Sequence, residues 1–198
     1  GTGGNLEMLM DMGDLDAFEF DETAREIAEE KSALSIPFGA LPHDIPHHEH
    51  RYDMIALFDV LEHIEEDTST LASLSDRLSN DGRIFVTVPA LPWLWSSHDV
   101  RHHHFRRYTR KSLRAAAEKA GLEVENSFYF NGLLLPVAVA MRSLKSLLRL
   151  DSPDDTMPSG FLNKALFKVF SSEKHLVGRF RLPLGLSVCA ILKQKHTN

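Results

Sequence analysis

The sequence predicts an α/β fold in which helices flank a mostly parallel central sheet. Short apolar runs of strand length occur at residues 54–58 and 83–88, and a segment with helical periodicity separates them. Strands that alternate with helices in this way favour parallel pairing. With 198 residues, 43% of them hydrophobic, the chain is long enough to bury one core. We therefore expect a single domain over residues 1–198.

The N-terminal elements follow from local patterns. Residues 5–12 are rich in Leu and Met and predict a short helix with one buried face, and residues 16–20 alternate like a strand. Asp21 stands where a helix N-cap belongs, ahead of apolar residues at helical spacing. The sequence opens on the glycines Gly1, Gly3 and Gly4 with no strand before them. We expect the first strand of the sheet to be absent from this chain and to precede Gly1 in the full protein.

The middle of the chain repeats the strand and helix rhythm. The continuous apolar run at 54–58 predicts a central strand that is covered on both faces. Residues 68–78 carry three leucines on one helical stripe, and Asn-Asp-Gly at 80–82 predicts a turn. The next strand, 83–88, ends at Pro89.

The C-terminal part adds a helical insertion. Residues 110–120 predict a helix closed by Gly121, and a strand follows at 122–129. Between about 131 and 183 we expect a helical insertion, with helices at roughly 133–150 and 161–175 separated by the breaker-rich stretch 151–160. The last predicted strand covers residues 186–192.

Charge is unevenly distributed along the chain, although the net charge is only −6. Residues 1–67 hold 18 acids and 3 bases, whereas residues 101–198 hold 7 acids and 17 bases. The basic half is suited to an anionic ligand, a nucleic acid or an anionic lipid surface, and the acidic half would repel all three. Attraction between the two halves explains the same asymmetry.

Cysteine usage and hydropathy suggest a location. The lone Cys189 excludes an internal disulfide, and no charged segment followed by an apolar stretch opens the chain. We therefore expect a cytoplasmic protein. The longest apolar stretch, 133–141, contains Pro136 and is far shorter than the ~20 residues that span a bilayer, so we expect no transmembrane helix.

The opening glycines and Glu19 point to a nucleoside cofactor. Glycines in a turn that leads into a helix let backbone N–H groups approach a ligand closely. Glu19 lies 16 residues beyond Gly3 at the end of the next predicted strand, where an acid can accept both hydroxyls of a ribose. Asp21 is the competing carboxylate, but it fits better as the N-cap.

Residues 52–64 read Tyr-Asp-Met-Ile-Ala-Leu-Phe-Asp-Val-Leu-Glu-His-Ile. This stretch resembles the D-V-L-E-H motif of class I S-adenosylmethionine-dependent methyltransferases. The resemblance continues in the opening glycines, in Glu19 and in residues 81–89, and it covers most of residues 1–130. It implies a Rossmann-like methyltransferase fold, S-adenosyl-L-methionine as cofactor and S-adenosyl-L-homocysteine as product.

The same resemblance assigns cofactor contacts residue by residue. It implies that Gly1 and Gly3 contact the methionine part, that Glu19 holds the ribose, and that Phe58 and Asp59 meet the methionyl amino group and the neighbouring face. Phe20 and His63 join this cofactor-binding set. The chain departs from the family at residues 39–42, where an acid that often holds the adenine amine is replaced by Gly-Ala-Leu-Pro. We therefore expect backbone groups of Ala40 and Leu41 to meet the adenine, with Asp44 as a further option.

The segment from Trp93 to Tyr108 follows the strand that should border the acceptor pocket. Here we expect Trp93, Trp95, Arg106, Arg107 and Tyr108 to bind the acceptor. The two guanidinium groups can hold a carboxylate or phosphate and the tryptophans can cover an apolar portion. Alternatively, Arg106, Arg107 and Tyr108 pin the loop by bonding backbone carbonyls.

Three residues of the same segment are candidates to accept a proton from the acceptor, namely His98, Asp99 and His104. A strong base is not obligatory, because methyl transfer from a sulfonium needs mainly in-line positioning. Six cations fall within 14 residues: Arg101, Arg106, Arg107, Arg110, Lys111 and Arg114. They favour an anionic small-molecule or carrier-linked acceptor, and we expect no nucleic acid.

Two further patterns in the sequence bear on metal binding and on membrane binding. The histidines at 43, 47, 48 and 50 and at 98 and 102–104 lack a closed ligand spacing, so we interpret them as solvated loop residues and expect no metal. The insertion carries basic residues among apolar ones, a pattern that fits an anionic membrane or a lipid-linked acceptor. Packing of these helices on the sheet edge or on a second subunit is the favoured alternative. These basic residues are Arg142, Lys145, Arg149, Lys164, Lys168, Lys174, Arg179 and Arg181.

Two rival functions remain open beside methyl transfer. An NAD(P)-dependent oxidoreductase shares a glycine turn and an acid at the position of Glu19, but it has no counterpart of residues 59–64, and no catalytic tyrosine–lysine pair is evident. A non-catalytic nucleotide-binding module of the same fold is supported by the missing adenine acid and the incomplete glycine motif.

Overall fold

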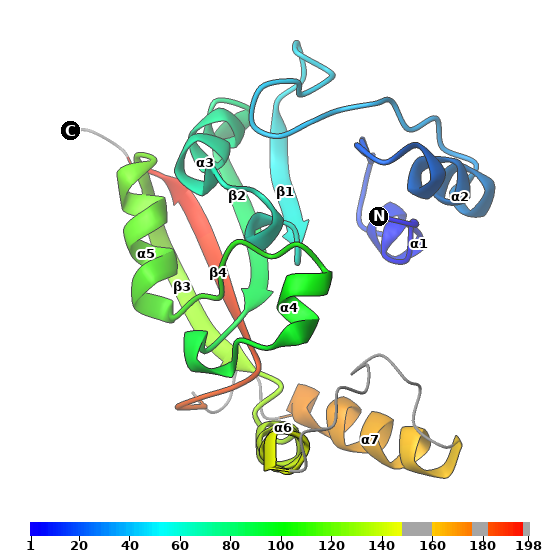
Figure 1. Cartoon of the computed structure of the whole chain (residues 1–198). Coiled ribbons are helices and arrows are strands. Elements are labelled where there is room, and N and C mark those ends of the chain that lie inside the picture. The colour runs from blue at the N-terminus through cyan, green and yellow to red at the C-terminus, as the bar shows by residue number, and fades with distance from the viewer. Residues whose placement is uncertain (148–159, 176–181, 196–198) are drawn as a thin grey trace. The chain divides into compact units, whose positions relative to one another are not determined.

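The computed structural model describes residues 1–147, 160–175 and 182–195. The chain divides into two compact units, residues 1–51 and residues 52–198 (Figure 1). The expectation of one domain over residues 1–198 stays a prediction. Each unit is described by itself.

The first unit contains two helices, α1 (Leu6–Met10) and α2 (Glu22–Ser32). The N-cap prediction for α2 is confirmed, because the Asp21 carboxylate accepts a hydrogen bond of 2.7 Å from the N–H of Ala24. The predicted helix at 5–12 forms, but it is shorter, and none of its residues is buried. A helix of five residues extends over only about 7.5 Å, too little for its apolar side chains to build a covered face.

The predicted strand at 16–20 is reduced to a single parallel bridge between Glu19 and Phe38. Glu19 donates its N–H to Pro37 and accepts from the N–H of Gly39. The ladder cannot extend backward, because Pro37 has no N–H for the next bond. It cannot extend forward either, because Asp21 already turns into the cap of α2.

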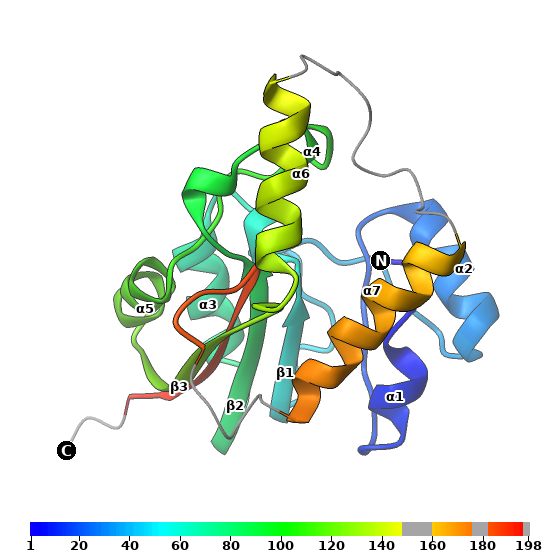
Figure 2. The same cartoon turned by 90° about the horizontal axis from the view of Figure 1, so that it is seen from below.

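The second unit is built on a four-stranded sheet in the order β1-β2-β4-β3 (Figures 1 and 2). The strands are β1 (Tyr52–Phe58), β2 (Leu78–Pro89), β3 (Leu122–Phe130) and β4 (Ser187–Gln194). β1 pairs parallel with β2, whereas β4 pairs antiparallel with both β2 and β3. Three strands therefore run in one direction and β4 alone runs against them. This arrangement confirms the α/β class. The shared direction of β1, β2 and β3 agrees with the predicted mostly parallel sheet, although β4 pairs antiparallel with both of its neighbours.

The prediction that residues 54–58 form a central strand is wrong for the sheet that the described residues make. β1 lies at its edge, and Met54 is 42% exposed. The sequence pattern gave the right element, but a strand needs a neighbour on each side to be central. β1 pairs with β2 on one side and has no second strand partner among the described residues.

The predicted turn at 80–82 lies inside β2 as a bulge. Tyr52 pairs with Leu78, but Met54 pairs with Arg83, so β2 carries extra residues opposite β1. A Cβ atom on Gly82 would lie 2.5 Å from the carbonyl oxygen of Tyr52. The glycine that indicated a turn instead permits close approach of two paired strands.

Helices α3 (Asp67–Ser75) and α5 (Arg110–Lys119) cover one face of the sheet (Figures 1 and 2). Leu71 of α3 and Leu113 of α5 are fully buried, as are Val86 and Val88 of β2. α5 ends as predicted, with Gly121 in the left-handed region at φ +79°.

The remaining described elements lie in loops and in the predicted insertion. They are the short helix α4 (Ser97–Arg101), the helices α6 (Leu135–Leu147) and α7 (Gly160–Ser172), and the 3-10 turns η1 (Leu61–His63), η2 (Pro92–Leu94) and η3 (Glu173–His175). The buried Glu173 carboxylate accepts hydrogen bonds of 3.1 Å from the N–H groups of Gly132 and Leu133 just before α6. None of the helices within the described ranges is both long and apolar enough to cross a membrane.

Candidate active site

The glycine turn packs closely on α2 in the first unit. Gly3 has φ +75°, and a Cβ atom there would lie 3.0 Å from Cα of Ala28. The carbonyl of Thr2 accepts a 3.0 Å hydrogen bond from Nζ of Lys31. Gly3 is therefore required by its backbone conformation and by helix packing, while nothing lies within 4 Å of the position a Cβ would take at Gly1.

Glu19 is held next to this turn. One carboxylate oxygen accepts 2.8 Å hydrogen bonds from the N–H groups of Phe20 and Asp21, and the other contacts the nitrogen of Gly1. The side chain is 18% exposed. The structure thus brings together two residues that the sequence predicted for the cofactor, Gly1 and Glu19, and fixes the orientation of the carboxylate.

An exposed aromatic pair lies at the same bridge. Phe20 is 69% exposed and Phe38 is 47% exposed, with ring centroids 5.9 Å apart. The pairing of Glu19 with Phe38 places both rings beside the acid. Phe38 was not among the residues predicted from the sequence, because its segment gave no strand signal long enough to place it opposite Glu19.

The loop expected to meet adenine is closed on itself. Ala40 and Asp44 exchange two backbone hydrogen bonds of 2.7 Å. The N–H of Ala40 is therefore already paired, whereas Leu41 is half-buried at the turn between them.

In the second unit, the chain turns sharply after β1. Asp59 has φ +52°, an unusual value for a residue with a side chain. Its N–H donates to the carbonyl and the hydroxyl of Thr87, at 3.0 and 3.2 Å, and the Thr87 hydroxyl donates back to its carboxylate at 3.4 Å. Partial burial raises the pKa of the Asp59 carboxyl, against the lowering effects of Thr87 and His104. Phe58 precedes it, with its ring centroid 5.7 Å from that of Phe85.

Asp99, on α4 in the segment that follows β2, is the centre of a buried polar cluster. It is fully buried and accepts hydrogen bonds from Nδ1 of His104 at 2.9 Å, Nε of Arg107 at 2.7 Å and the N–H of Ser96 at 2.9 Å. Burial alone would raise the pKa of Asp99, but the donors Arg107, His104 and Ser96 hold it below its usual value. Arg107 also donates to the carbonyl of Ala90 at 3.1 Å.

Arg106 and Tyr108 are anchored separately from Arg107. Arg106 pairs with Asp67 at 2.8 Å and donates to the carbonyl of Glu65 at 2.6 Å. The hydroxyl of the buried Tyr108 donates to the same Asp67 carboxylate at 2.9 Å. These contacts tie the predicted acceptor segment to the start of α3.

The loop after α4 also brings histidines toward the turn after β1. The His63 and His104 rings meet edge-on with centroids 4.6 Å apart, and the His98 centroid lies 6.3 Å from that of His104. Partial burial, with a smaller effect of His104, lowers the pKa of His63. The sequence predicted roles for all three histidines, and the structure places them in one cluster.

Glu62 belongs to this cluster, although no sequence pattern predicted a role for it. Its side chain is buried, and burial together with the nearby Asp59 raises the pKa of Glu62 to about 8. The N–H of Phe105 donates to the carbonyl of Glu62 at 2.7 Å. The sequence offered one indication of a role for Glu62, because the residue lies inside the motif at 52–64. Its proximity to His104 follows only from the fold.

The predicted acceptor-binding tryptophans are exposed. Trp93 is 62% and Trp95 43% exposed, and Phe105 in the same segment is 50% exposed. At least five of the six cations in this region have interaction partners, Arg101 among them. Besides Arg106 and Arg107, Arg110 donates to Ser127 and Arg114 pairs with Glu118. Contacts within the protein therefore involve most of these cations.

The basic residues of the helical insertion are only partly covered by the structure. Lys164 and Lys168 on α7 are exposed, as is Phe167 between them, at 67%. The helix positions of Arg142, Lys145 and Lys174 are described without their side chains. Arg149, Arg179 and Arg181 lie outside the described residues.

Comparison with known proteins gives the family and the fold. Residues 1–127 match the family described as a methyltransferase domain. No curated protein sequence matches the chain.

Among solved structures, one described as a sarcosine dimethylglycine methyltransferase from Galdieria sulphuraria aligns with a TM-score of 0.63 at 14% identity, covering 98% of this chain and 76% of that one. An S-adenosylmethionine-dependent methyltransferase from Clostridium acetobutylicum aligns with a TM-score of 0.58 at 10% identity, covering 99% and 81%. A chain from the complex between the Haloferax volcanii Trm112 methyltransferase activator and a methyltransferase aligns with a TM-score of 0.61 at 16% identity, covering 100% and 80%.

Proposed function

The chain belongs to the methyltransferase domain family and is a methyltransferase that depends on S-adenosylmethionine; we propose that it methylates a small-molecule or carrier-linked acceptor. When bound, the cofactor supplies an electrophilic methyl group on a sulfonium. The observation that carries the methyltransferase assignment is the family match over residues 1–127, which includes both the glycine turn and the motif at 52–64. The residues present must then provide acceptors for ribose hydroxyls, an apolar surface for adenine and an anion for the methionyl ammonium group.

The ribose is assigned to Glu19. The N–H groups of Phe20 and Asp21 hold one carboxylate oxygen and the nitrogen of Gly1 contacts the other, so the carboxylate is kept oriented beside the glycine turn. A fixed carboxylate can accept from two neighbouring hydroxyls at once. This donor and acceptor chemistry fits the cofactor.

The adenine is assigned to an apolar surface beside Glu19. Phe20 and Phe38 present exposed rings at the bridge that holds Glu19, and flat aromatic faces suit a purine. Leu41 remains a candidate for the adenine edge, as the sequence suggested. Ala40 is less suitable, because Asp44 already takes its N–H.

Each of the two units offers candidate residues for the methionyl end, as the family resemblance implies. Gly1 and Gly3 offer backbone groups, while Phe58, Asp59 and His63 follow β1. Asp59 fits an ammonium group, because partial burial raises the pKa of its carboxyl group and a bound cation would favour the ionised form.

Acceptor binding is assigned to Trp93 and Trp95, whose exposed rings can cover an apolar portion of the ligand. Arg106 keeps a candidate role toward an anionic group, because its side chain is 31% exposed. Arg107 is proposed as a positioning residue, since its side chain is 5% exposed and bonded to Asp99 and Ala90. Tyr108 has the same kind of role through Asp67.

Proton acceptance, where an acceptor requires it, is assigned to His98. Asp99 is fully buried, so it cannot reach an acceptor and instead orients His104 and Arg107. His98 is half-buried on α4 and lies in the same ring cluster.

The cofactor assignment is tested by calorimetric titration of Glu19→Gln with S-adenosylhomocysteine, using the full-length protein. The amide keeps an oxygen for the Phe20 and Asp21 N–H groups but loses the charge. We expect affinity to fall by about tenfold to 100-fold, as for loss of a charged hydrogen-bond acceptor.

The matched control is Asp21→Ala, which removes the neighbouring carboxylate. It should lower stability by about 1 kcal/mol through loss of the N-cap and leave the affinity unchanged. Reversed effects of the two substitutions would assign the ribose to Asp21.

A further inference from the structure

Glu62 has a buried carboxylate oxygen without a partner. The residue is 1% exposed, and within the described part of the chain no group hydrogen bonds to its Oε2 atom. A buried polar atom left unpaired costs free energy and calls for an unseen water, proton or ion. The side chains that surround this oxygen indicate which of the three it is.

Two imidazoles converge on this carboxylate. One potential ligand atom from each of Glu62, His63 and His104 lies within 4.8 Å of the others. His63 follows Glu62 in the turn η1, whereas His104 comes from the loop after α4 and is held in place by the bond from Phe105 N–H to the Glu62 carbonyl. The three side chains therefore surround one point from two separate segments.

His104 is oriented as metal-binding histidines are. Its Nδ1 donates to Asp99 at 2.9 Å, so Nε2 is the nitrogen left for a ligand. Asp99 is itself fixed by Arg107 at 2.7 Å. A carboxylate that orients the far nitrogen of an imidazole sets the tautomer and raises the basicity of the metal-facing nitrogen.

We propose that Glu62, His63 and His104 bind one divalent transition-metal ion. Two imidazole nitrogens and one carboxylate oxygen suit Zn²⁺, Mn²⁺ or Co²⁺ rather than Ca²⁺, which prefers oxygen ligands alone. Three protein ligands leave coordination positions for water or for an oxygen of a bound ligand. The inference rests on these side chains and not on methyl transfer.

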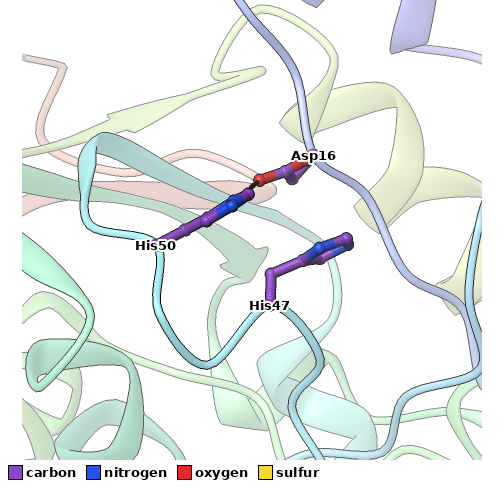
Figure 3. A group of neighbouring side chains, drawn as sticks. All are labelled: Asp16, His47 and His50. Atoms are coloured by element: carbon purple, nitrogen blue, oxygen red, sulfur yellow. Dashed lines mark hydrogen bonds and ion pairs between the residues drawn. The ribbon is translucent and has the colours of Figure 1, made fainter.

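A second group, Asp16, His47 and His50, also has its potential ligand atoms within 4.8 Å of one another (Figure 3). Asp16 and His50 already pair at 2.6 Å, and both residues are exposed. This group offers no buried unpaired atom, so it carries no proposal. It must nevertheless be removed in the test, because exposed histidines bind added metal.

The experiment uses the full-length protein with His47→Gln and His50→Gln, dialysed against a chelator and then titrated with Co²⁺. Bound metal is counted by elemental analysis, and the visible Co²⁺ spectrum reports its ligands. We expect one equivalent to bind in this background. Adding His104→Gln should weaken binding by 100-fold or more, and adding the neighbouring His102→Gln should leave it unchanged.

Circular dichroism checks that each variant folds, and His63→Gln, at an exposed residue, replaces His104→Gln if the latter unfolds. Unchanged Co²⁺ binding in folded His104→Gln or His63→Gln would overturn the proposal, as would the absence of any binding in the background protein. S-adenosylhomocysteine titration of the background protein and of His104→Gln, a residue outside the proposed cofactor-binding set, keeps the two claims separate, because a failed metal site with intact cofactor binding leaves the proposed function standing.

Discussion

Asp99 shows how one residue can organise a site that it cannot itself contact. Its buried carboxylate receives the Arg107 guanidinium, the His104 imidazole and a backbone N–H. The sequence indicated a functional segment here through its Trp, His, Asp and Arg residues, but it could not separate the groups that face a ligand from those that hold the loop. The residue types in a segment indicate which chemistry it can perform, whereas burial decides which of these side chains can reach a ligand.

Arg107 and Arg106 should differ sharply in their effect on stability. Arg107→Ala removes a buried partner and leaves Asp99 charged and buried, which we expect to cost about 3 kcal/mol or more. Arg106→Ala breaks a more exposed pair with Asp67 and should cost about 1 kcal/mol or less. Urea denaturation of the two variants measures both values. If the two variants are equally stable and Arg107→Ala no longer methylates the acceptor, Arg107 binds the acceptor and is not a positioning residue.

Among the elements, the strands and helices were predicted best where the pattern was local. The run at 54–58, the helix at 110–120 with Gly121 and the Asp21 cap all form as predicted. Pairing could not be predicted, because it depends on partners that are distant in sequence. Three features that depend on pairing were therefore not predicted: the edge position of β1, the antiparallel insertion of β4 and the single bridge at Glu19.

Gly82 tests the bulge in β2. Gly82→Ala would place a Cβ atom 2.5 Å from the Tyr52 carbonyl, and that oxygen is part of the sheet backbone and cannot move aside cheaply. We expect a loss of about 1–3 kcal/mol in thermal or urea unfolding. The neighbouring exposed Asp81→Ala should change stability by no more than about 0.5 kcal/mol. If Gly82→Ala is as stable as Asp81→Ala, the close approach of the strands is not present.

At the scale of the whole molecule, the chain forms two compact units, and residues predicted for the cofactor occur in both. The sequence located these residues through the glycine turn, Glu19 and the motif at 52–64. Glu62 could not be singled out from the sequence. Two features distinguish it, a buried oxygen without a partner and the proximity of His104, which lies 42 positions later in the chain, and both depend on the folded structure. Such a contact is a property of the folded chain.

Cys189 reports on the integrity of the second unit. It lies on β4 between β2 and β3, is 1% exposed, and burial raises the pKa of its thiol to about 12. Only the thiolate reacts with disulfide reagents, so at pH 8 the folded protein should not react and the unfolded protein should react readily. The rate of labelling with Ellman's reagent across a urea series should follow the unfolding curve. Rapid labelling without urea would contradict the buried position of β4.

The central claim, that the chain is an S-adenosylmethionine-dependent methyltransferase and not an oxidoreductase of related fold, is tested most directly by a pair of titrations. Calorimetry on the full-length protein compares S-adenosylhomocysteine with NAD under the same conditions. The account predicts saturable binding of one S-adenosylhomocysteine per chain and no binding of NAD. Saturable binding of NAD without S-adenosylhomocysteine would contradict it, as would binding of neither.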